Sequence, residues 1–78
     1  MENTNRYSTT DLSLAAALSL LHTISDVSHV DARRVAFVFE NSDQLQTDID
    51  KYWNHELLVE PQAYFYQLKQ LKNRIYSQ

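Results

Sequence analysis

The side chains that could act as acids, bases, nucleophiles or metal ligands follow no familiar catalytic or metal-binding pattern. The three histidines, His22, His29 and His55, do not recur three or four residues apart, the spacing that places two metal ligands on one helix face. Asp48 and Asp50 lie in a predicted helix, and we expect both on its solvated face. A histidine can still meet an aspartate through the fold, and the serines lie in no motif of a nucleophilic enzyme. We therefore expect no catalytic residue, no metal and no cofactor.

Two residue types are missing from the chain. Its 78 residues include no glycine and no cysteine. Loops that cradle phosphate, bind dinucleotides or clamp RNA in KH domains need glycine, because its backbone can approach a ligand closely. Without cysteine, disulfides, thiolate catalysis and cysteine-based zinc sites are excluded. These absences favour a protein that works by binding rather than by catalysis.

Charge and length indicate a small acidic domain. The net charge of −3 and the isoelectric point near 5.4 disfavour unspecific binding to nucleic acid or to an anionic membrane. The most apolar stretch, residues 12–21, is too short to cross a bilayer, and the polar residues 1–6 resemble no secretion signal. We expect a single domain of residues 1–78 with residues 1–5 frayed, located in the cytoplasm.

Hydrophobic periodicity predicts the order β-α-β-β-α-α, an α+β fold with a three-stranded sheet and three helices against one face. A short strand at residues 6–8 precedes a helix that Thr9 or Thr10 caps and that ends near Leu21. This helix is apolar over most of its circumference, so we expect it to be covered on more than one side. Residues 22–31 are mostly extended, and a turn at 31–34 joins them to an antiparallel strand at 35–39, which is central or covered on both faces.

The second half of the chain predicts two helices. Asn41 followed by Gln44 resembles a capping box at the start of the first of them. The apolar stripe of this helix places Trp53 in the core, where we also expect Phe37 of the preceding strand. Pro61 suits the first position of the last helix.

The last helix is predicted to bury one stripe and to expose another. The expected buried stripe consists of Tyr64, Phe65, Leu68, Leu71 and Ile75. Tyr66 falls outside that stripe, and Gln70 and Asn73 lie near the same side of the helix. Because exposed aromatic rings are typical interface anchors, we expect these three residues to contact a protein partner or a second copy of the chain.

Nucleic-acid binding is the second hypothesis. Lys69, Lys72 and Arg74 form a basic cluster on the helix that also carries Tyr66 and Tyr76. Basic charge interleaved with aromatic rings is typical of proteins that bind single-stranded nucleic acid. The alternative is that these cations complement only the negative end of the helix dipole.

Residues 33–40 are similar in part to the third-strand motif of the RNA recognition motif family. The matching positions are Arg33, Ala36, Phe37 and Val38. The glycine and two aromatic residues of that motif are replaced here by Arg34, Val35 and Glu40. A last helix also stands where that fold has its fourth strand. The resemblance implies a strand that stacks on bases, and the alternative is a buried structural strand.

From Tyr7 to Ser77 the chain also resembles a family of small uncharacterised domains of prokaryotes and mobile elements. The resemblance is carried by residues 7–12 with the alanine-rich helix, and by residues 37–40, 52–54, 59–61 and 71–77. Glu60 departs from the aspartate cap expected before Pro61. The resemblance implies no activity, but rather a small non-enzymatic accessory protein that acts through protein–protein interaction, including self-association. A mobile-element or phage inhibitor of a host defence protein is the third hypothesis.

Overall fold

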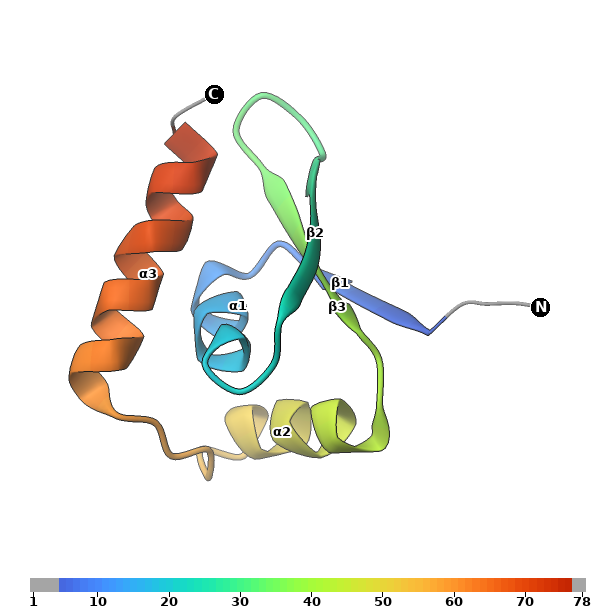
Figure 1. Cartoon of the computed structure of the whole chain (residues 1–78), viewed down its shortest axis with the longest axis vertical. Helices are drawn as coiled ribbons and strands as arrows, with labels where there is room; N and C mark the ends of the chain where they lie inside the picture. The colour runs from blue at the N-terminus through green and yellow to red at the C-terminus, as the bar shows by residue number, and fades with distance from the viewer. Residues whose placement is uncertain (1–4, 77–78) are drawn as a thin grey trace.

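A computed structural model describes residues 5–76 and confirms the predicted order of elements and the α+β class (Figure 1). The strands are β1 (Arg6–Thr9), β2 (Ile24–His29) and β3 (Val35–Glu40). The helices are α1 (Leu12–Ser19), α2 (Asp43–Trp53) and α3 (Pro61–Tyr76), and among the described residues no helix is long and apolar enough to cross a membrane. The fraying predicted for residues 1–5 falls almost entirely on residues 1–4, which lie outside the described residues.

β3 is the central strand of an antiparallel sheet with the order β1-β3-β2. Tyr7 of β1 lies opposite Phe39, and Val27 of β2 lies opposite Phe37. A register shift near the start of β2 interrupts the ladder between β2 and β3. β3 has a strand on each edge, and five successive apolar residues of this strand are buried, as the sequence pattern predicts.

The turn between β2 and β3 is closed by a side chain. The Asp31 carboxylate accepts hydrogen bonds from the backbone N–H groups of Arg33 and Arg34, each at 2.9 Å. These bonds hold the pKa of the Asp31 carboxyl below its ordinary value. Aspartate therefore supports a turn that contains no glycine, and the predicted antiparallel hairpin is confirmed.

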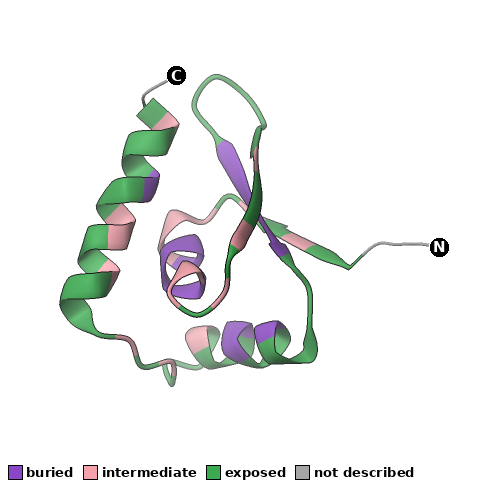
Figure 2. Ribbon diagram, in the orientation of Figure 1, coloured by how far each residue is buried: buried purple, intermediate pink, exposed green. Residues whose placement is uncertain are grey.

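The helices pack against one face of the sheet, and α1 lies at the centre of this layer (Figure 1). α1 contacts α2, α3 and β1, and its residues from Leu14 to Leu18 are all buried (Figure 2). Ala15 and Ala16 have no exposed surface. These contacts confirm that this helix is covered on more than one side.

The hydrophobic core joins the inner face of β3 to the helices. Phe37 and Phe39 are fully buried, which confirms the core position predicted for Phe37. The buried core residues are Leu14, Ala15, Ala16, Leu18, Val35, Phe37, Phe39, Leu45, Ile49 and Leu71. Leu71 is the one residue of α3 that is buried, so α3 rests on the core along a narrow stripe.

The core positions predicted for Trp53 and Phe65 are wrong, because these residues are 58% and 60% exposed. The buried side of α2 consists of Leu45, Asp48 and Ile49, and Trp53 lies at the edge of that side. On α3 each residue advances about 100° around the helix axis, which turns Phe65 away from the core when Tyr64 faces it. Both errors are therefore errors of helix phase.

α1 is capped by Asp11 and not by Thr9 or Thr10. The Asp11 carboxylate accepts a hydrogen bond from the backbone N–H of Leu14 at 3.1 Å. The Thr9 hydroxyl instead accepts a bond from the backbone N–H of Asp11 at 3.0 Å. The threonine therefore holds the capping residue in place, and α1 ends two residues before the predicted end.

α2 is capped by Ser42 and not by Asn41. The Ser42 hydroxyl accepts a hydrogen bond from the backbone N–H of Leu45 at 3.0 Å. The side chain of Gln44 donates to the Asp48 carboxylate at 3.2 Å, so it does not complete a capping box. The predicted helix is present, but its cap lies one residue further along the chain.

α3 begins at Pro61, as predicted. The Glu60 carboxylate accepts a hydrogen bond from the backbone N–H of Ala63 at 2.7 Å. Glutamate therefore satisfies one free donor at the start of α3, the role for which an aspartate is expected.

Candidate functional site

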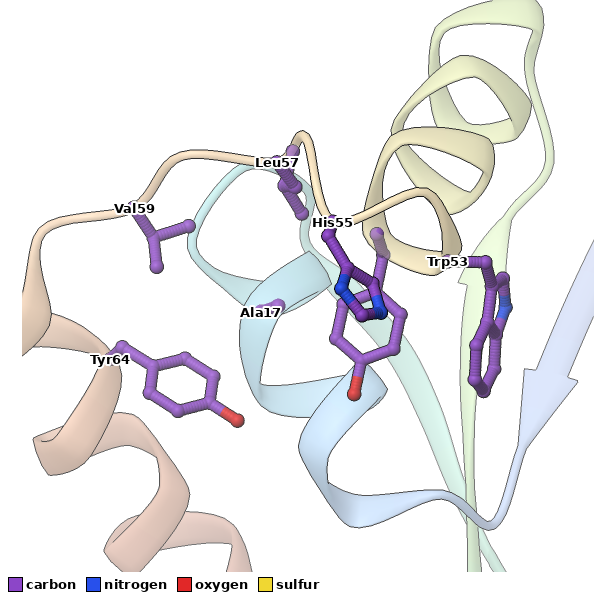
Figure 3. A pocket seen from close by; sticks show the side chains of 7 residues that line it. Ala17, Trp53, His55, Leu57, Val59 and Tyr64 are labelled. Carbon is purple, nitrogen blue, oxygen red and sulfur yellow. The ribbon is translucent and has the colours of Figure 1, made fainter.

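A pocket of about 390 Å³ opens where the end of α2 and the start of α3 meet the side of α1 (Figure 3). We call it the connector pocket, because residues 54–60, which connect α2 to α3, form part of its wall. It is lined by Ala17, Tyr52, Trp53, His55, Leu57, Val59 and Tyr64. Its volume falls in the range of small-ligand sites, about 300–1,000 Å³. The site therefore offers room for a small molecule or for one large side chain of a partner.

Aromatic rings form much of the wall of the connector pocket. The rings of Tyr52 and Trp53 meet edge to face, with centroids 5.0 Å apart and planes at 88°. The Tyr64 hydroxyl donates a hydrogen bond to the backbone carbonyl oxygen of Ser13 at 3.3 Å, which ties α3 to the start of α1. In Figure 3, Tyr64 and His55 lie on opposite sides of Ala17. The rings are thus positioned by contacts within the chain, so the pocket is preformed.

The Tyr52 hydroxyl stays protonated at neutral pH. Burial raises the pKa of Tyr52, and the negative charge of Asp11 raises it further. Asp11 is held nearby because it caps α1. The pocket therefore has a neutral phenol on its wall and a carboxylate near that phenol.

His55 reaches the pocket because it ends α2 in an unusual backbone conformation. Its φ of 63° lies in the left-handed region, where glycine is the usual residue. The backbone N–H of His55 bonds to the carbonyl of Tyr52 at 3.2 Å, and that of Glu56 bonds to Lys51 at 2.8 Å. These two bonds form a Schellman motif with His55 at the position that glycine normally occupies. The chain therefore places an imidazole on the pocket wall at a position where a glycine would relieve backbone strain.

We expect His55→Gly to keep or raise the stability of the fold, by up to about 1 kcal/mol, because glycine accepts positive φ without strain. Urea unfolding followed by circular dichroism measures this difference. His55→Ala is the matched control, since it also removes the imidazole but keeps a Cβ atom at positive φ. It should be less stable than His55→Gly. If glycine is the more destabilising of the two, the backbone at residue 55 carries no strain that glycine relieves.

The predicted interface residues lie outside the connector pocket. Tyr66, Gln70 and Asn73 are all exposed on α3, and their spacing of four and three residues keeps them on one side of this helix. Tyr66 is 63% exposed, which confirms that it points away from the core. The three uncharged side chains stand on the exposed side of α3, and none of them lines the connector pocket.

Two of the predicted cations align with aromatic rings on another side of α3. The positions of Phe65, Lys69, Lys72 and Tyr76 recur at helical spacing, and we call this row the basic stripe. The Lys69 ammonium lies 5.4 Å from the centre of the Phe65 ring. Arg74 does not belong to the row, because it lines a separate hollow beside β2. The structure thus brings together the two lysines but not the third cation of the predicted cluster.

The strand that resembles the RNA recognition motif presents no ring to solvent. Phe37, the aromatic residue that matches the motif, is fully buried under the helices. Ala36 and Val38 point to the other face of the sheet, where Ser28 and Ser8 lie opposite them. The motif positions at Val35 and Phe37 therefore face the core, where neither side chain can stack on a base.

Asp48 is buried, contrary to the expectation that it is solvated. It is 5% exposed, and its carboxylate lies 2.7 Å from the Nε2 atom of His22. Gln44 donates a second hydrogen bond to Asp48. Asp50 is exposed, as predicted. The pair of His22 and Asp48 links the chain just after α1 to the middle of α2, so it has a structural role.

The described residues contain no group of three histidine, aspartate or glutamate side chains that could hold a metal ion. Ser19 and His22 line the same shallow hollow, but the Ser19 hydroxyl donates to the carbonyl of Ala16 at 2.8 Å. That bond holds the hydroxyl on its own helix. The connector pocket is therefore the stronger candidate site.

The connector pocket was missed at the sequence level because its walls come from distant segments. Two signals point to it in retrospect. The chain has its densest aromatic region at residues 52–66. The chain also has no glycine to take the positive φ that often ends a helix. After Trp53 come Asn54 and His55, and both residue types tolerate positive φ.

A family model matches residues 4–77, which is nearly the whole chain, and its description is a domain of unknown function (DUF5659). No curated protein and no solved structure matches the chain. The match agrees with the expected resemblance to small uncharacterised domains. It assigns no activity to any residue, so the function has to be inferred from the surface of the molecule.

Proposed function

The chain belongs to the DUF5659 family, and we propose that it is a small non-enzymatic accessory protein that binds a segment of a protein partner in the connector pocket. The observation that carries the proposal is the position of Trp53, a largely exposed ring at the wall of a preformed aromatic pocket. Aromatic anchors in pockets are the usual centres of protein interfaces.

The exposure of Trp53 reduces the stability that so small a domain can reach. A tryptophan buries on the order of 150–250 Å², so leaving more than half of it in water forgoes about 3 kcal/mol of transfer free energy. A small domain is stabilised by only about 5–15 kcal/mol in total. Leu58, which is 89% exposed, lies on the connector beside the pocket. A partner that covers these side chains recovers this free energy on binding.

The connector pocket is a better docking site than the predicted surface at Tyr66. Tyr66 is as exposed as Trp53, but it stands on the exposed side of α3 and does not line the connector pocket. Interface residues that contribute most to affinity cluster in pockets that exclude water. The uncharged surface of Tyr66, Gln70 and Asn73 is then the second site to consider, with another copy of the chain as its partner.

We expect Trp53→Ala to weaken binding of peptides by about tenfold or more, because truncation of an aromatic anchor costs ~1–3 kcal/mol. The test is to select peptides from a random display library on the purified full chain and to measure their affinities by fluorescence anisotropy. Tyr66→Ala is the matched control, since it removes an equally exposed ring outside the pocket. Peptides that bind Trp53→Ala as well as the original chain would contradict the proposal. Selective loss with Tyr66→Ala would favour the surface of α3.

A second candidate function is supported by the basic stripe. In this row two lysines, Lys69 and Lys72, lie between two aromatic rings, Phe65 and Tyr76. Arg33 lines a hollow together with Tyr76. Such a row suits single-stranded nucleic acid. We rank this function second for two reasons. The Lys69 ammonium lies over the Phe65 ring, where a base would have to stack, and the net charge of the whole chain is negative. Salt-dependent retention on single-stranded DNA that is lost in the Lys69→Gln, Lys72→Gln double variant would reverse the ranking.

The biological setting belongs to the proposal as well. We propose that the protein acts in the cytoplasm of a prokaryote, encoded by the host or by a mobile element. In the second case a host defence protein that it inhibits is the natural partner. The resemblance to small prokaryotic and mobile-element domains supports this setting, and the genes that neighbour members of the family would test it.

A further inference from the structure

We infer that the connector pocket takes a basic side chain of the partner, an alkylammonium or a guanidinium group. This inference rests on the proposed function, because it names the chemistry of the group that enters the same pocket. It is carried by two independent observations, the aromatic walls of the pocket and the sign of the charges around it.

The walls of the connector pocket are aromatic rings, whose electron-rich faces attract a cation. Tyr52, Trp53 and Tyr64 supply three electron-rich rings to one pocket, and each attracts a cation placed over its face. The edge-to-face contact between Tyr52 and Trp53 leaves their planes at 88°, so these two rings form adjoining walls. Ala17 makes a small floor that leaves the space between the rings open. Rings set at right angles around a small floor are the arrangement that binds alkylammonium groups in other proteins.

The charges near the pocket are negative. Residues 52–68 include Glu56 and Glu60 but no lysine or arginine. Asp11 lies close enough to influence the pKa of Tyr52 on the pocket wall. Lys51 is near in sequence, but it precedes Trp53 by two residues and therefore lies on nearly the opposite side of α2. A cation is attracted to this region, and an anion is repelled.

The partial charges at the helix ends do not make the region around the connector pocket positive. α3 starts near the pocket, and the hydroxyl of the lining residue Tyr64 reaches Ser13 at the start of α1. Each helix start carries a partial charge of about +0.5. Each of these starts is capped by a full negative charge, from Asp11 and Glu60. The end of α2 also points to the pocket and contributes a partial negative charge. The sum remains negative, which distinguishes this pocket from an anion site at a bare helix start.

The single tryptophan of the chain is a built-in reporter for this inference. Trp53 is on the pocket wall, so its fluorescence responds to a bound group. The probes are choline and 3,3-dimethylbutan-1-ol, which have nearly the same shape but differ in charge. We expect choline to change the fluorescence with a dissociation constant about tenfold lower than that of the neutral alcohol, because the rings and carboxylates favour the cation.

Tyr64→Leu and Tyr66→Leu separate the pocket from the rest of α3. Both variants keep Trp53 as the reporter, but only Tyr64 lines the pocket. We expect choline binding to weaken about fivefold or more in Tyr64→Leu and to stay unchanged in Tyr66→Leu. Glu56→Gln should weaken it as well, since it removes one negative charge without changing the size of the side chain. Circular dichroism shows whether each variant is folded, and Glu56→Gln at the surface provides a test if Tyr64→Leu is not.

Three results would overturn the inference. The first is a neutral alcohol that binds as tightly as choline, and the second is choline binding that ignores both Tyr64→Leu and Glu56→Gln. The third is the absence of any response of Trp53 to either probe up to molar concentrations. The proposed function fails separately, because it predicts that selected peptides depend on Trp53 whatever their charge. Peptides that require Trp53 but carry no essential lysine or arginine would keep the pocket as a docking site and reject a basic ligand.

Discussion

Replacing Phe37 by alanine is expected to lower the free energy of unfolding by about 3–5 kcal/mol, the range for a buried phenylalanine. Phe37 is fully buried at the centre of the middle strand, and its backbone is paired on both sides with Thr9 and Val27. Removing the ring leaves a cavity between β3 and α1 that the rigid sheet cannot close. Because a domain of this size is stabilised by about 5–15 kcal/mol, urea unfolding should show a large loss.

Trp53→Ala is the control for the loss of a large ring at an exposed position. Since Trp53 is 58% exposed, we expect a loss well below that of Phe37→Ala, about 1–2 kcal/mol at most. A similar loss in both variants would show that Trp53 packs into the core in solution. The comparison therefore tests the phase of α2 and shows whether the pocket can be altered without unfolding the protein.

Replacing Asp48 by alanine is expected to destabilise the fold by about 1–2 kcal/mol, because it removes both hydrogen bonds of a buried carboxylate and leaves the half-buried His22 without its partner. Asp48 is the acceptor for both the Nε2 atom of His22, at 2.7 Å, and the side chain of Gln44. Thermal unfolding at constant pH measures the loss. Asp50→Ala is the matched control on the same helix, and it should have little effect because Asp50 is exposed.

A double-mutant cycle isolates the contribution of the pair of His22 and Asp48. The cycle consists of His22→Leu, Asp48→Leu and the variant with both changes. The double variant should lose less stability than the two single variants together, since neither side chain of the pair is then left without its partner. Full additivity of the single changes would show that the two side chains do not interact. Equal stability of Asp48→Ala and the original chain would show that Asp48 is solvated.

Stability and the proposed binding share only part of their residues: Tyr52 and Tyr64 line the pocket and also pack against the core. The core is built from β3, α1 and the inner sides of α2 and α3, whereas the connector pocket uses their ends and the segment between them. His55 shows the separation most clearly. Its imidazole faces the pocket from a backbone conformation that glycine adopts with less strain, so we expect His55→Gly to keep or raise the stability of the fold.

Local features of the sequence determined which elements form and in what order. Five apolar residues in a row are sufficient to predict β3 as a buried strand, because a strand with one solvated face alternates apolar and polar residues. Pro61 is sufficient to place the start of α3, since its ring fixes φ and it needs no hydrogen-bond donor there. The absence of glycine likewise excludes whole classes of ligand site, because their loops need a backbone that no Cβ atom shields.

The tertiary structure alone decided which side of each helix is buried and where the pocket opens. α2 buries Leu45 and Ile49 and pairs Asp48 with His22, 26 residues earlier, and with this rotation Trp53 points outwards. The caps also shifted by one or two residues, because several neighbouring hydroxyl and carboxylate groups can serve and packing selects among them. The pocket joins Ala17 to Tyr52 and Tyr64, which are brought together only when α1, α2 and α3 pack around one core. Periodicity describes one helix at a time, whereas a pocket between helices depends on their relative rotation, which is set by contacts between distant residues.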